Sequence, residues 1–411
     1  MPDRVDNIVI IGAGQAGAQA CVSLRQQGFD GAITIVGDEN HPPYQRPPLS
    51  KKFLAGELPA KRLTLKAPNY YADKNIELIT GRRAVSIERG RSRVRLDNEQ
   101  VLPYSRLLLA SGSRVREIPA PGASLPGINY LRTIVDVEAI QKNFRAGRRL
   151  VVVGGGYIGL EVAAIAKQQG LDVVVIEAME RVLARVVAPE VSQFYARVHR
   201  EAGVEIQCGL GVTAFEGDEH VTQVVTSDGR RFPCDLVVVG IGIVPETTLA
   251  ESAGLSCDDG IIVDAYAATS DPRIFAAGDC TRHPSTLTGG LVRLESVANA
   301  IEQAKVAARS MLGGHDAYDE VPWFWSDQYD VKLQIAGLAQ DYDSVVVRGN
   351  PDTNEFAVFY LRQGRLIAVD AVNRPREFMQ GKKLVSKAPM IPPAELADDT
   401  TPFPVIAKRY L

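Results

Sequence analysis

The sequence carries one strand–turn–helix pattern twice, and this repeat restricts the possible folds more than any other feature. The first copy has an apolar run at Ile8–Ile11, the glycine turn GAGQAG at 12–17 and helical periodicity at 18–27. A second apolar run at 33–36 follows, and Asp38 closes the unit. A Gly-x-Gly-x-x-Gly turn in this context is typical of a site that holds the pyrophosphate of a dinucleotide at a helix N-terminus.

Each part of the first copy has a physical role. Gly12 permits the tight turn, and Gly14 lets a pyrophosphate approach the backbone without meeting a Cβ. Gly17 lets the helix lie close to the strand, and Asp38 can accept hydrogen bonds from a ribose diol. The alternative is a glycine-rich turn that binds nothing, which the strand before it, the helix after it and the acid disfavour.

The second copy repeats this order. An apolar run at 150–153 leads into GGGYIG at 154–159, followed by helical periodicity at 158–169, a strand at 173–176 and Glu177. Two such units predict two dinucleotides held face to face. The simplest use of that arrangement is hydride transfer from a nicotinamide to a flavin.

Glu177 bears on the choice of nicotinamide cofactor. A carboxylate at this position hydrogen-bonds a free 2′-OH and repels a 2′-phosphate, which favours NADH over NADPH. Arg181 and Arg185 lie nearby in the sequence and would soften that discrimination.

Composition excludes several classes of protein. The 411 residues carry a net charge of −3, so nothing indicates a nucleic-acid partner. No run approaches the roughly 18 apolar residues of a membrane helix. The first expected strand begins at Ile8 and leaves little room for a signal peptide, so we expect a cytoplasmic protein without a membrane partner.

Cysteines and histidines argue against disulfides and metals. The five cysteines occur singly, with no Cys-x-x-Cys pair, and the five histidines do not cluster with them. We therefore expect no disulfide framework and no metal site. The residues are Cys21, Cys208, Cys234, Cys257 and Cys280, with His41, His199, His220, His283 and His315.

Two further stretches have open interpretations. Lys51 lies in a proline-rich loop that runs into a short helix at Leu49, and it is either a surface lysine or a charge held against a cofactor. Residues 76–110 alternate apolar and polar side chains, which predicts a strand meander. Six of its arginines indicate a solvated sheet face or a docking surface for an acidic partner, namely Arg82, Arg83, Arg89, Arg91, Arg93 and Arg95.

The remaining part of the chain contains one more candidate and a change of character. Asp279 follows a short strand at 274–277, where it can bind a ligand hydroxyl, cap a helix, or do both. Helical periodicity continues over 293–308. From 317 to 411, strand-and-turn patterns and a helix at 375–385 predict an α+β domain, in which Trp323 is a core residue or borders the cofactor.

With these residues collected, the chain resembles the NADH-dependent ferredoxin reductases of bacterial oxygenase systems. These are the putidaredoxin-reductase and biphenyl-dioxygenase-reductase type, which is related to rubredoxin reductase and apoptosis-inducing factor. The resemblance runs almost end to end and is carried by GAGQAG, PPYQRPPLSKKFL, YLRT, GGGYIGLE, TSDPRIFAAGD, RLESVANAIEQA and PWFWSDQY.

The resemblance implies an α/β fold with two Rossmann-like dinucleotide-binding domains, like glutathione reductase, and a C-terminal α+β domain. The FAD-binding domain would comprise 1–113 and 246–316, the NADH-binding domain 114–245, and the C-terminal domain 317–411. The implied FAD-binding residues are Gly12, Gly14, Ala16, Asp38, Lys51, Ala84, Arg132, Asp279, Val297 and Trp323.

The resemblance also implies an NADH site and a catalytic pair. A Lys51–Glu161 ion pair beside the flavin would stabilise the anionic reduced ring. Taken alone, Glu161 is interpreted as a buried or capping helix acid. The implied NADH-binding residues are Gly156, Tyr157, Ile158, Gly159, Glu177 and Gly242.

The implied activity is electron transfer from NADH through FAD to a [2Fe–2S] ferredoxin that serves a cytochrome P450 or an aromatic-ring dioxygenase. Thiol chemistry is not expected, because the loop after Asp38 has no cysteine and Cys280 has no partner in the sequence. The alternatives are a rubredoxin reductase and an NADH-sensing flavoprotein like apoptosis-inducing factor.

Overall fold

The computed structural model describes residues 5–411, and its contacts divide the chain into two compact units. The first unit contains both the N-terminal glycine turn and Asp279, and the second contains the GGGYIG turn and the C-terminal part. The division into three domains at 113, 245 and 316 stays a prediction. The first unit comprises Met1–Gln45, Lys61–Arg114 and Val244–Pro322, and the second comprises Arg46–Ala60, Val115–Ile243 and Trp323–Leu411.

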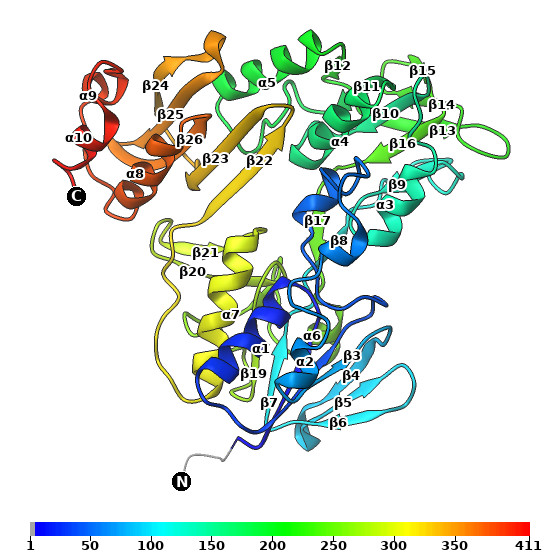
Figure 1. The fold of residues 1–411 in the computed structure, drawn as a ribbon, viewed down its shortest axis with the longest axis vertical. Coiled ribbons are helices and arrows are strands. Elements are labelled where there is room, and N and C mark those ends of the chain that lie inside the picture. The colour runs from blue at the N-terminus through cyan, green and yellow to red at the C-terminus, as the bar shows by residue number, and fades with distance from the viewer. Residues whose placement is uncertain (1–4) are drawn as a thin grey trace. The chain divides into compact units, whose positions relative to one another are not determined.

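A five-stranded parallel sheet forms the centre of the first unit, in the order β19-β7-β1-β2-β3 (Figure 1). Alternate side chains of β1 point to opposite faces, as the strand period of two requires. Ile8 and Ile10 pack with helices α1 and α7, whereas Val9 and Ile11 pack with the antiparallel sheet β4-β5-β6. The bounds are β1 Asn7–Ile11, α1 Gln15–Gln26, β2 Ala32–Val36, β3 Ile76–Ile79, β4 Ala84–Glu88, β5 Arg93–Leu96, β6 Val101–Pro103, β7 Arg106–Leu109, β19 Ile274–Ala276 and α7 Val297–Met311.

The prediction of one meander over 76–110 was wrong at both ends. β3 and β7 pair in parallel with β2 and β1, and only β4, β5 and β6 form an antiparallel meander. Local alternation does not distinguish these cases, because the partners of β3 and β7 lie far away in the sequence. Within the meander, Arg95 pairs with Glu88 and Glu99, and Arg89 pairs with Asp271, so part of the positive charge is neutralised internally.

The second unit repeats the parallel arrangement in the order β12-β11-β10-β16-β9 (Figure 1). One face of this sheet packs on the small antiparallel sheet β13-β14-β15 through Val151, Val153 and Phe215. The bounds are β9 Ile128–Tyr130, α3 Ile134–Gln141, β10 Arg149–Val153, α4 Tyr157–Gln168, β11 Asp172–Glu177, α5 Pro189–Glu201, β12 Glu205–Cys208, β13 Val212–Glu216, β14 Gln223–Thr226, β15 Arg231–Pro233 and β16 Leu236–Val239.

The C-terminal part of this unit is an antiparallel sheet in the order β22-β23-β26-β25-β24, against which helix α8 packs. The expected helix at 375–385 is confirmed, and so is the predicted α/β fold class with its α+β C-terminal part. Between residues 5 and 411, no helix is both long and apolar enough to cross a membrane. The bounds are β22 Trp323–Gln328, β23 Val331–Gly337, β24 Ser344–Asn350, β25 Glu355–Arg362, β26 Arg365–Val372, α8 Pro375–Val385, α9 Pro393–Ala397 and α10 Phe403–Ala407.

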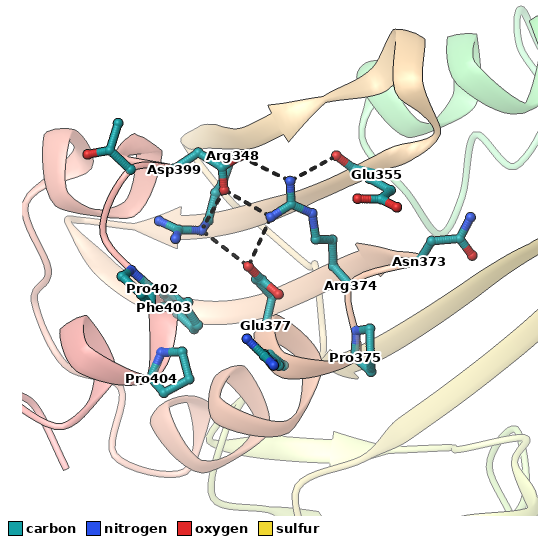
Figure 2. A pocket seen from close by; sticks show the side chains of 12 residues that line it. Arg348, Glu355, Asn373, Arg374, Pro375, Glu377, Asp399, Pro402, Phe403 and Pro404 are labelled. Carbon is teal, nitrogen blue, oxygen red and sulfur yellow. Dashed lines mark hydrogen bonds and ion pairs between the residues drawn. The ribbon is translucent and has the colours of Figure 1, made fainter.

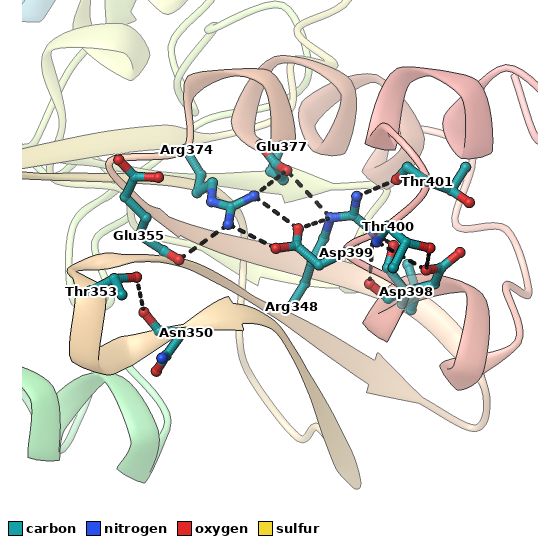
Figure 3. Close-up of polar contacts among 11 residues, drawn as sticks. Arg348, Asn350, Thr353, Glu355, Arg374, Glu377, Asp398, Asp399, Thr400 and Thr401 are labelled. Carbon is teal, nitrogen blue, oxygen red and sulfur yellow. Dashed lines mark hydrogen bonds and ion pairs between the residues drawn. The ribbon is translucent and has the colours of Figure 1, made fainter.

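A buried arginine joins the C-terminal helices to this sheet (Figure 3). Arg348 on β24 is 2% exposed, and its guanidinium donates to the carbonyls of Asp398 and Thr401, the latter at 2.5 Å. Its Nε lies 3.3 Å from Glu377 and 3.4 Å from Asp399. A buried guanidinium is stable only when its donors are satisfied, so the sheet and the tail segment depend on one side chain.

Replacement of this arginine should therefore be costly. We predict that Arg348→Met destabilises the protein by about 3–5 kcal/mol, because it leaves buried acceptors without donors. Thermal unfolding followed by circular dichroism measures the effect. Arg376→Met, at an exposed arginine in the first turn of α8, is the matched control and should leave Tm nearly unchanged. An equal decrease in Tm in both variants would contradict the inferred role of Arg348 in joining the C-terminal helices to the sheet.

Asp370 on β26 is another buried ionisable residue. It is fully buried, and its Oδ2 accepts a hydrogen bond of 2.5 Å from the Tyr360 hydroxyl, which itself accepts from the Ala188 N–H. Burial raises the pKa of Asp370 to about 7. A carboxyl whose pKa is higher in the folded than in the unfolded chain binds its proton more tightly when folded.

Stability should consequently fall as pH rises from about 4 through about 7, since the folded state alone retains this proton there. Asp370→Asn stays neutral and still accepts from Tyr360. We predict that the Tm of this variant differs little from that of the wild type near pH 5 and is higher near pH 8. The corresponding gain in the free energy of unfolding near pH 8 is up to roughly 4 kcal/mol. A constant Tm difference across the pH series would show that Asp370 does not titrate in this range.

Candidate functional site

The first glycine turn is built by two backbone contacts that exclude a side chain. Gly12 has φ +112°, and a Cβ there would lie 2.0 Å from the Ala110 carbonyl oxygen. A Cβ on Gly17 would lie 2.0 Å from the Gly12 carbonyl oxygen. Gly14 differs, because nothing in the described chain lies within 4 Å of its hypothetical Cβ. Helix α1 starts there without a side-chain cap, which leaves its first N–H groups available to an anion.

Other predicted residues of the first unit lie around this turn. A Cβ on Gly278, which precedes Asp279, would be 3.2 Å from the Ala16 Cβ, so the two turns are adjacent. The Asp279 carboxylate accepts from the Ser113 hydroxyl at 3.1 Å. Asp38 is exposed at the end of β2, where its carboxylate is available to a ribose. All of these groups lie at the carboxyl ends of parallel strands, the position where open α/β sheets bind ligands.

Two more predicted residues belong to the same unit. The loop before Ala84 is held to the Asp38 turn, because the Arg82 N–H donates to the Gly37 carbonyl at 3.0 Å. Val297 is the first residue of α7, and Ser296 caps that helix by accepting from the Asn299 N–H. The helix begins four residues later than the predicted Arg293, because this cap fixes its start.

The second glycine turn has the same construction. Gly154 has φ +107°, and its Cβ would meet the Gly240 carbonyl oxygen at 2.4 Å. A Cβ on Gly159 would be 2.0 Å from the Gly154 carbonyl oxygen, whereas Gly156 has open space in the described chain. Helix α4 again begins without a side-chain cap. The two turns thus offer the same kind of cradle for a pyrophosphate.

The side chains of Tyr157 and Ile158 in this second turn have different surroundings. Ile158 is 39% exposed, whereas the Tyr157 ring contacts Phe324 at a centroid distance of 4.9 Å. Burial raises the pKa of Tyr157 well above its usual value, so its hydroxyl stays neutral. Tyr157 is consequently suited to offer its backbone, rather than its hydroxyl, to a ligand.

Glu177 is fixed by two backbone donors. Its Oε2 accepts from the Gly155 N–H at 2.6 Å and its Oε1 from the Met179 N–H at 2.8 Å. Arg181 donates to the carbonyls of Val187 and Ala184, which removes it from the pair of arginines expected to soften the discrimination. Arg185 is exposed, and its Nη2 would lie 3.7 Å from a Cβ on Gly242.

Lys51 and Glu161 form the ion pair that the resemblance implied. Lys51 Nζ lies 2.7 Å from Glu161 Oε2, with the lysine side chain 18% exposed and the glutamate 2%. The Ser50 hydroxyl donates to the same oxygen at 2.5 Å, and the Ser326 hydroxyl donates to Oε1 at 2.6 Å. These two serines were missed in the sequence, because hydroxyls that are 111 and 165 residues distant from Glu161 give no local signal.

Arg132 and Trp323 also lie in the second unit. The Arg132 carbonyl accepts from the Arg46 guanidinium at 2.6 Å, so its backbone is fixed by the loop that carries Lys51. Trp323 stacks on Trp325 at 5.6 Å and lies under the Lys382 ammonium at 5.5 Å. Their roles toward a flavin stay predictions.

A cavity of about 370 Å³ lies in the C-terminal part and contains none of the predicted site residues. Figure 2 shows Arg348, Arg374 and Glu377 directed toward one another in its lining. Arg374 binds Asp399 at 2.9 Å, so the charged groups neutralise each other. The cavity is therefore interpreted as part of the Arg348 interactions that join the C-terminal helices to the sheet, and not as a cofactor-binding site. Among the described residues, no group of three or more potential ligands is placed to hold a metal.

The comparisons with known proteins agree with this geometry. Residues 6–309 match the family described as pyridine nucleotide-disulphide oxidoreductase, and residues 323–406 match a reductase C-terminal domain. Putidaredoxin reductase of Pseudomonas putida is 45% identical over 404 residues, which cover 97% of this chain and 96% of the relative. The ferredoxin–NAD(+) reductase component of the anthranilate 1,2-dioxygenase system of Burkholderia cepacia is 42% identical, with 96% and 98% covered.

The similarity extends to a solved structure. In the covalent putidaredoxin reductase–putidaredoxin complex, the matching chain is 44% identical with a TM-score of 0.96, covering 98% of this chain and 99% of that one. The chain therefore belongs to the family of pyridine nucleotide-disulphide oxidoreductases.

Proposed function

We propose that the protein is a cytoplasmic, FAD-dependent NADH:ferredoxin reductase whose [2Fe–2S] ferredoxin serves a cytochrome P450 or an aromatic-ring dioxygenase. The observation that carries the proposal is the pair of matching glycine cradles, one in each unit, each at an uncapped helix N-terminus. Of the two relatives named above, one is by its name a putidaredoxin reductase and the other is the ferredoxin–NAD(+) reductase component of a dioxygenase system. The described cysteines are all free, which suits a reducing compartment.

The residues of the first turn suit FAD. The open space at Gly14 and the free N–H groups of α1 accommodate a pyrophosphate, to which Gly12 and Ala16 contribute backbone. Asp38 binds the adenosine ribose and Asp279 binds the ribityl chain. Ala84 and Val297 of the first unit line the site. Lys51, Arg132 and Trp323 are further FAD-binding residues in this proposal. When bound, FAD supplies the chemistry that converts a two-electron hydride into single electrons.

The second turn suits NADH. Gly156, Tyr157, Ile158 and Gly159 present backbone to its pyrophosphate, and Gly242 lies toward the nicotinamide. Glu177 accepts from the ribose 2′-OH, and its fixed carboxylate repels a 2′-phosphate. Since Arg181 is engaged with backbone carbonyls, only Arg185 of the two nearby arginines stays available to weaken this preference.

Lys51 and Glu161 supply a fixed charge pair rather than a general acid or a nucleophile. The lysine places positive charge where negative charge develops on a reduced ring, and the buried glutamate holds the ammonium in position. Thiol chemistry has no support, because burial raises the pKa of Cys21 to about 12 and also raises that of the buried Cys280.

Gly159→Ala should separate the two cofactor sites. Its Cβ would displace the Gly154 carbonyl, so we predict at least a tenfold rise in the Kd for NADH with the FAD content unchanged. Stopped-flow reduction of the flavin across a range of NADH concentrations measures this. Gly170→Ala, at the exposed end of α4, tests for general helix damage and should bind NADH normally. Loss of FAD from Gly159→Ala would contradict the assignment of the second turn.

The activity itself is tested by NADH-driven cytochrome c reduction with and without an added [2Fe–2S] ferredoxin. We predict a large ferredoxin-dependent rate. Replacing the ferredoxin with a rubredoxin distinguishes the rubredoxin reductase alternative. Prompt flavin reduction by NADH with slow turnover on both acceptors would favour the NADH-sensing alternative, and failure of NADH to reduce the flavin would contradict the proposal as a whole.

A further inference from the structure

Four buried or half-buried side chains continue away from the Glu161 carboxylate as one line of hydrogen bonds. Ser326 Oγ lies 2.6 Å from Glu161 Oε1, and Gln328 Nε2 lies 3.1 Å from Ser326 Oγ. His199 Nε2 lies 2.8 Å from Gln328 Oε1, and the Tyr329 hydroxyl lies 3.2 Å from His199 Nδ1. Every pair joins side chains of the second unit, and none belongs to the cofactor turns.

Secondary structure explains why these groups meet. Ser326 and Gln328 are two residues apart on β22, so they share one face of the strand. Helix α4, which carries Glu161, packs against this strand, and α5 brings His199 to its end. Tyr329 follows β22 directly and has φ +56°, a left-handed turn that places its hydroxyl beside the His199 ring.

All the donors in this line point toward the carboxylate. Because the Gln328 amide nitrogen donates to Ser326, its oxygen must accept from His199, which puts the proton on Nε2. Burial lowers the pKa of His199, so its ring is neutral and Nδ1 accepts from Tyr329. The order is Tyr329 to His199 to Gln328 to Ser326 to Glu161, and aligned hydrogen bonds of this kind polarise one another.

The line of hydrogen bonds supplies a donor to the buried Glu161 carboxylate. Glu161 is 2% exposed, and a buried carboxylate is stable only with strong donors or a cation close by. Lys51 and Ser50 both contact Oε2, so that among residues 5–411 only Ser326 donates a hydrogen bond to Oε1. Tyr157 and Tyr195 are two titratable groups that interact with Glu161, and burial raises the pKa of each, so neither adds a charge. Both tyrosines also interact with the carboxyl of Asp370.

We propose that Ser326, Gln328 and His199 are positioning residues, which donate toward the Glu161 carboxylate and hold it in place for the ion pair with Lys51. They act through Glu161 and do not touch a cofactor. The relevance of this line to electron transfer rests on the proposed function, whereas its effect on the Glu161 carboxyl does not. The line of hydrogen bonds thus runs from the Lys51–Glu161 pair to the C-terminal end of β22.

The test is a titration of the Glu161 carboxyl in the FAD-loaded protein. Carbon-13 NMR of glutamate labelled at Cδ gives the pH midpoint of protonation, with Glu161→Gln identifying the signal. Ser326→Ala removes a hydrogen bond to a charged oxygen, so the midpoint should rise by about one to two pH units. Gln328→Leu should raise it by roughly a tenth to a third of that amount, and Tyr329→Phe by less again.

A merely structural role of these residues would not produce shifts that decrease in size with distance from Glu161. Ser326→Thr keeps the hydroxyl and should restore the wild-type midpoint. Ser192→Ala is the matched control, because this buried serine on α5 donates to the Val182 carbonyl, outside the line, and its loss should move nothing. The acid limb of the flavin-reduction rate against pH should shift in the same order as the NMR midpoints.

Two results would overturn the proposal. One is an unchanged midpoint in Ser326→Ala while Ser50→Ala, which removes the donor to the other oxygen, does shift it. The other is a shift in Tyr329→Phe as large as that in Ser326→Ala. If Ser326→Ala fails to fold, the order of Gln328→Leu and Tyr329→Phe against Ser50→Ala still decides the question. Absence of ferredoxin-dependent turnover in the wild type would reject the proposed function but leave this order intact.

Discussion

Contact between the backbone of a strand-to-helix turn and its own helix determines the rest of this structure. In both units, a glycine in the first turn of the helix lies so close to the carbonyl of the first glycine that a Cβ would come within 2.0 Å of it. The closeness lets α1 and α4 lie flat on their sheets. The N-cap residues Gly14 and Gly156 have no side chain that could cap the helix, so its N-terminus is able to bind an anion. Close packing and anion binding thus both depend on glycine at fixed positions of the turn.

The Lys51–Glu161 charge pair of the second unit depends on a different kind of support. A carboxylate as buried as Glu161 cannot rely on its lysine alone, since the desolvation of both ions offsets much of their attraction. Ser50 and Ser326 supply neutral donors to the two oxygens, so the pair is stabilised by hydrogen bonds as well as by charge. The sheet of the C-terminal part thereby contributes directly to a site whose other members come from the α4 helix and the Lys51 loop.

Much of the fold could be predicted from the sequence, because strand, glycine turn and helix follow one another locally. Both turns, α8 and the α+β character of the C-terminal part were predicted on such local patterns. Pairing between distant segments was not predictable in the same way. The placement of β3 and β7 in the parallel sheet was missed because alternation does not reveal a partner. Within the site, the role of Glu161 was predicted from the resemblance, whereas the contact of Ser326 with Glu161 was found only in the structure.

The arginine clamp on β24 has a consequence for the order in which the protein is made. The carbonyl groups that satisfy Arg348 lie 48 to 53 residues further along the chain. At the usual pace of synthesis, β24 emerges on the order of seconds before the residues that complete its hydrogen bonds. Until these residues are available, the guanidinium has only water and the nearer side chains as partners. The C-terminal core around Arg348 can therefore be completed only after the tail segment has been synthesised.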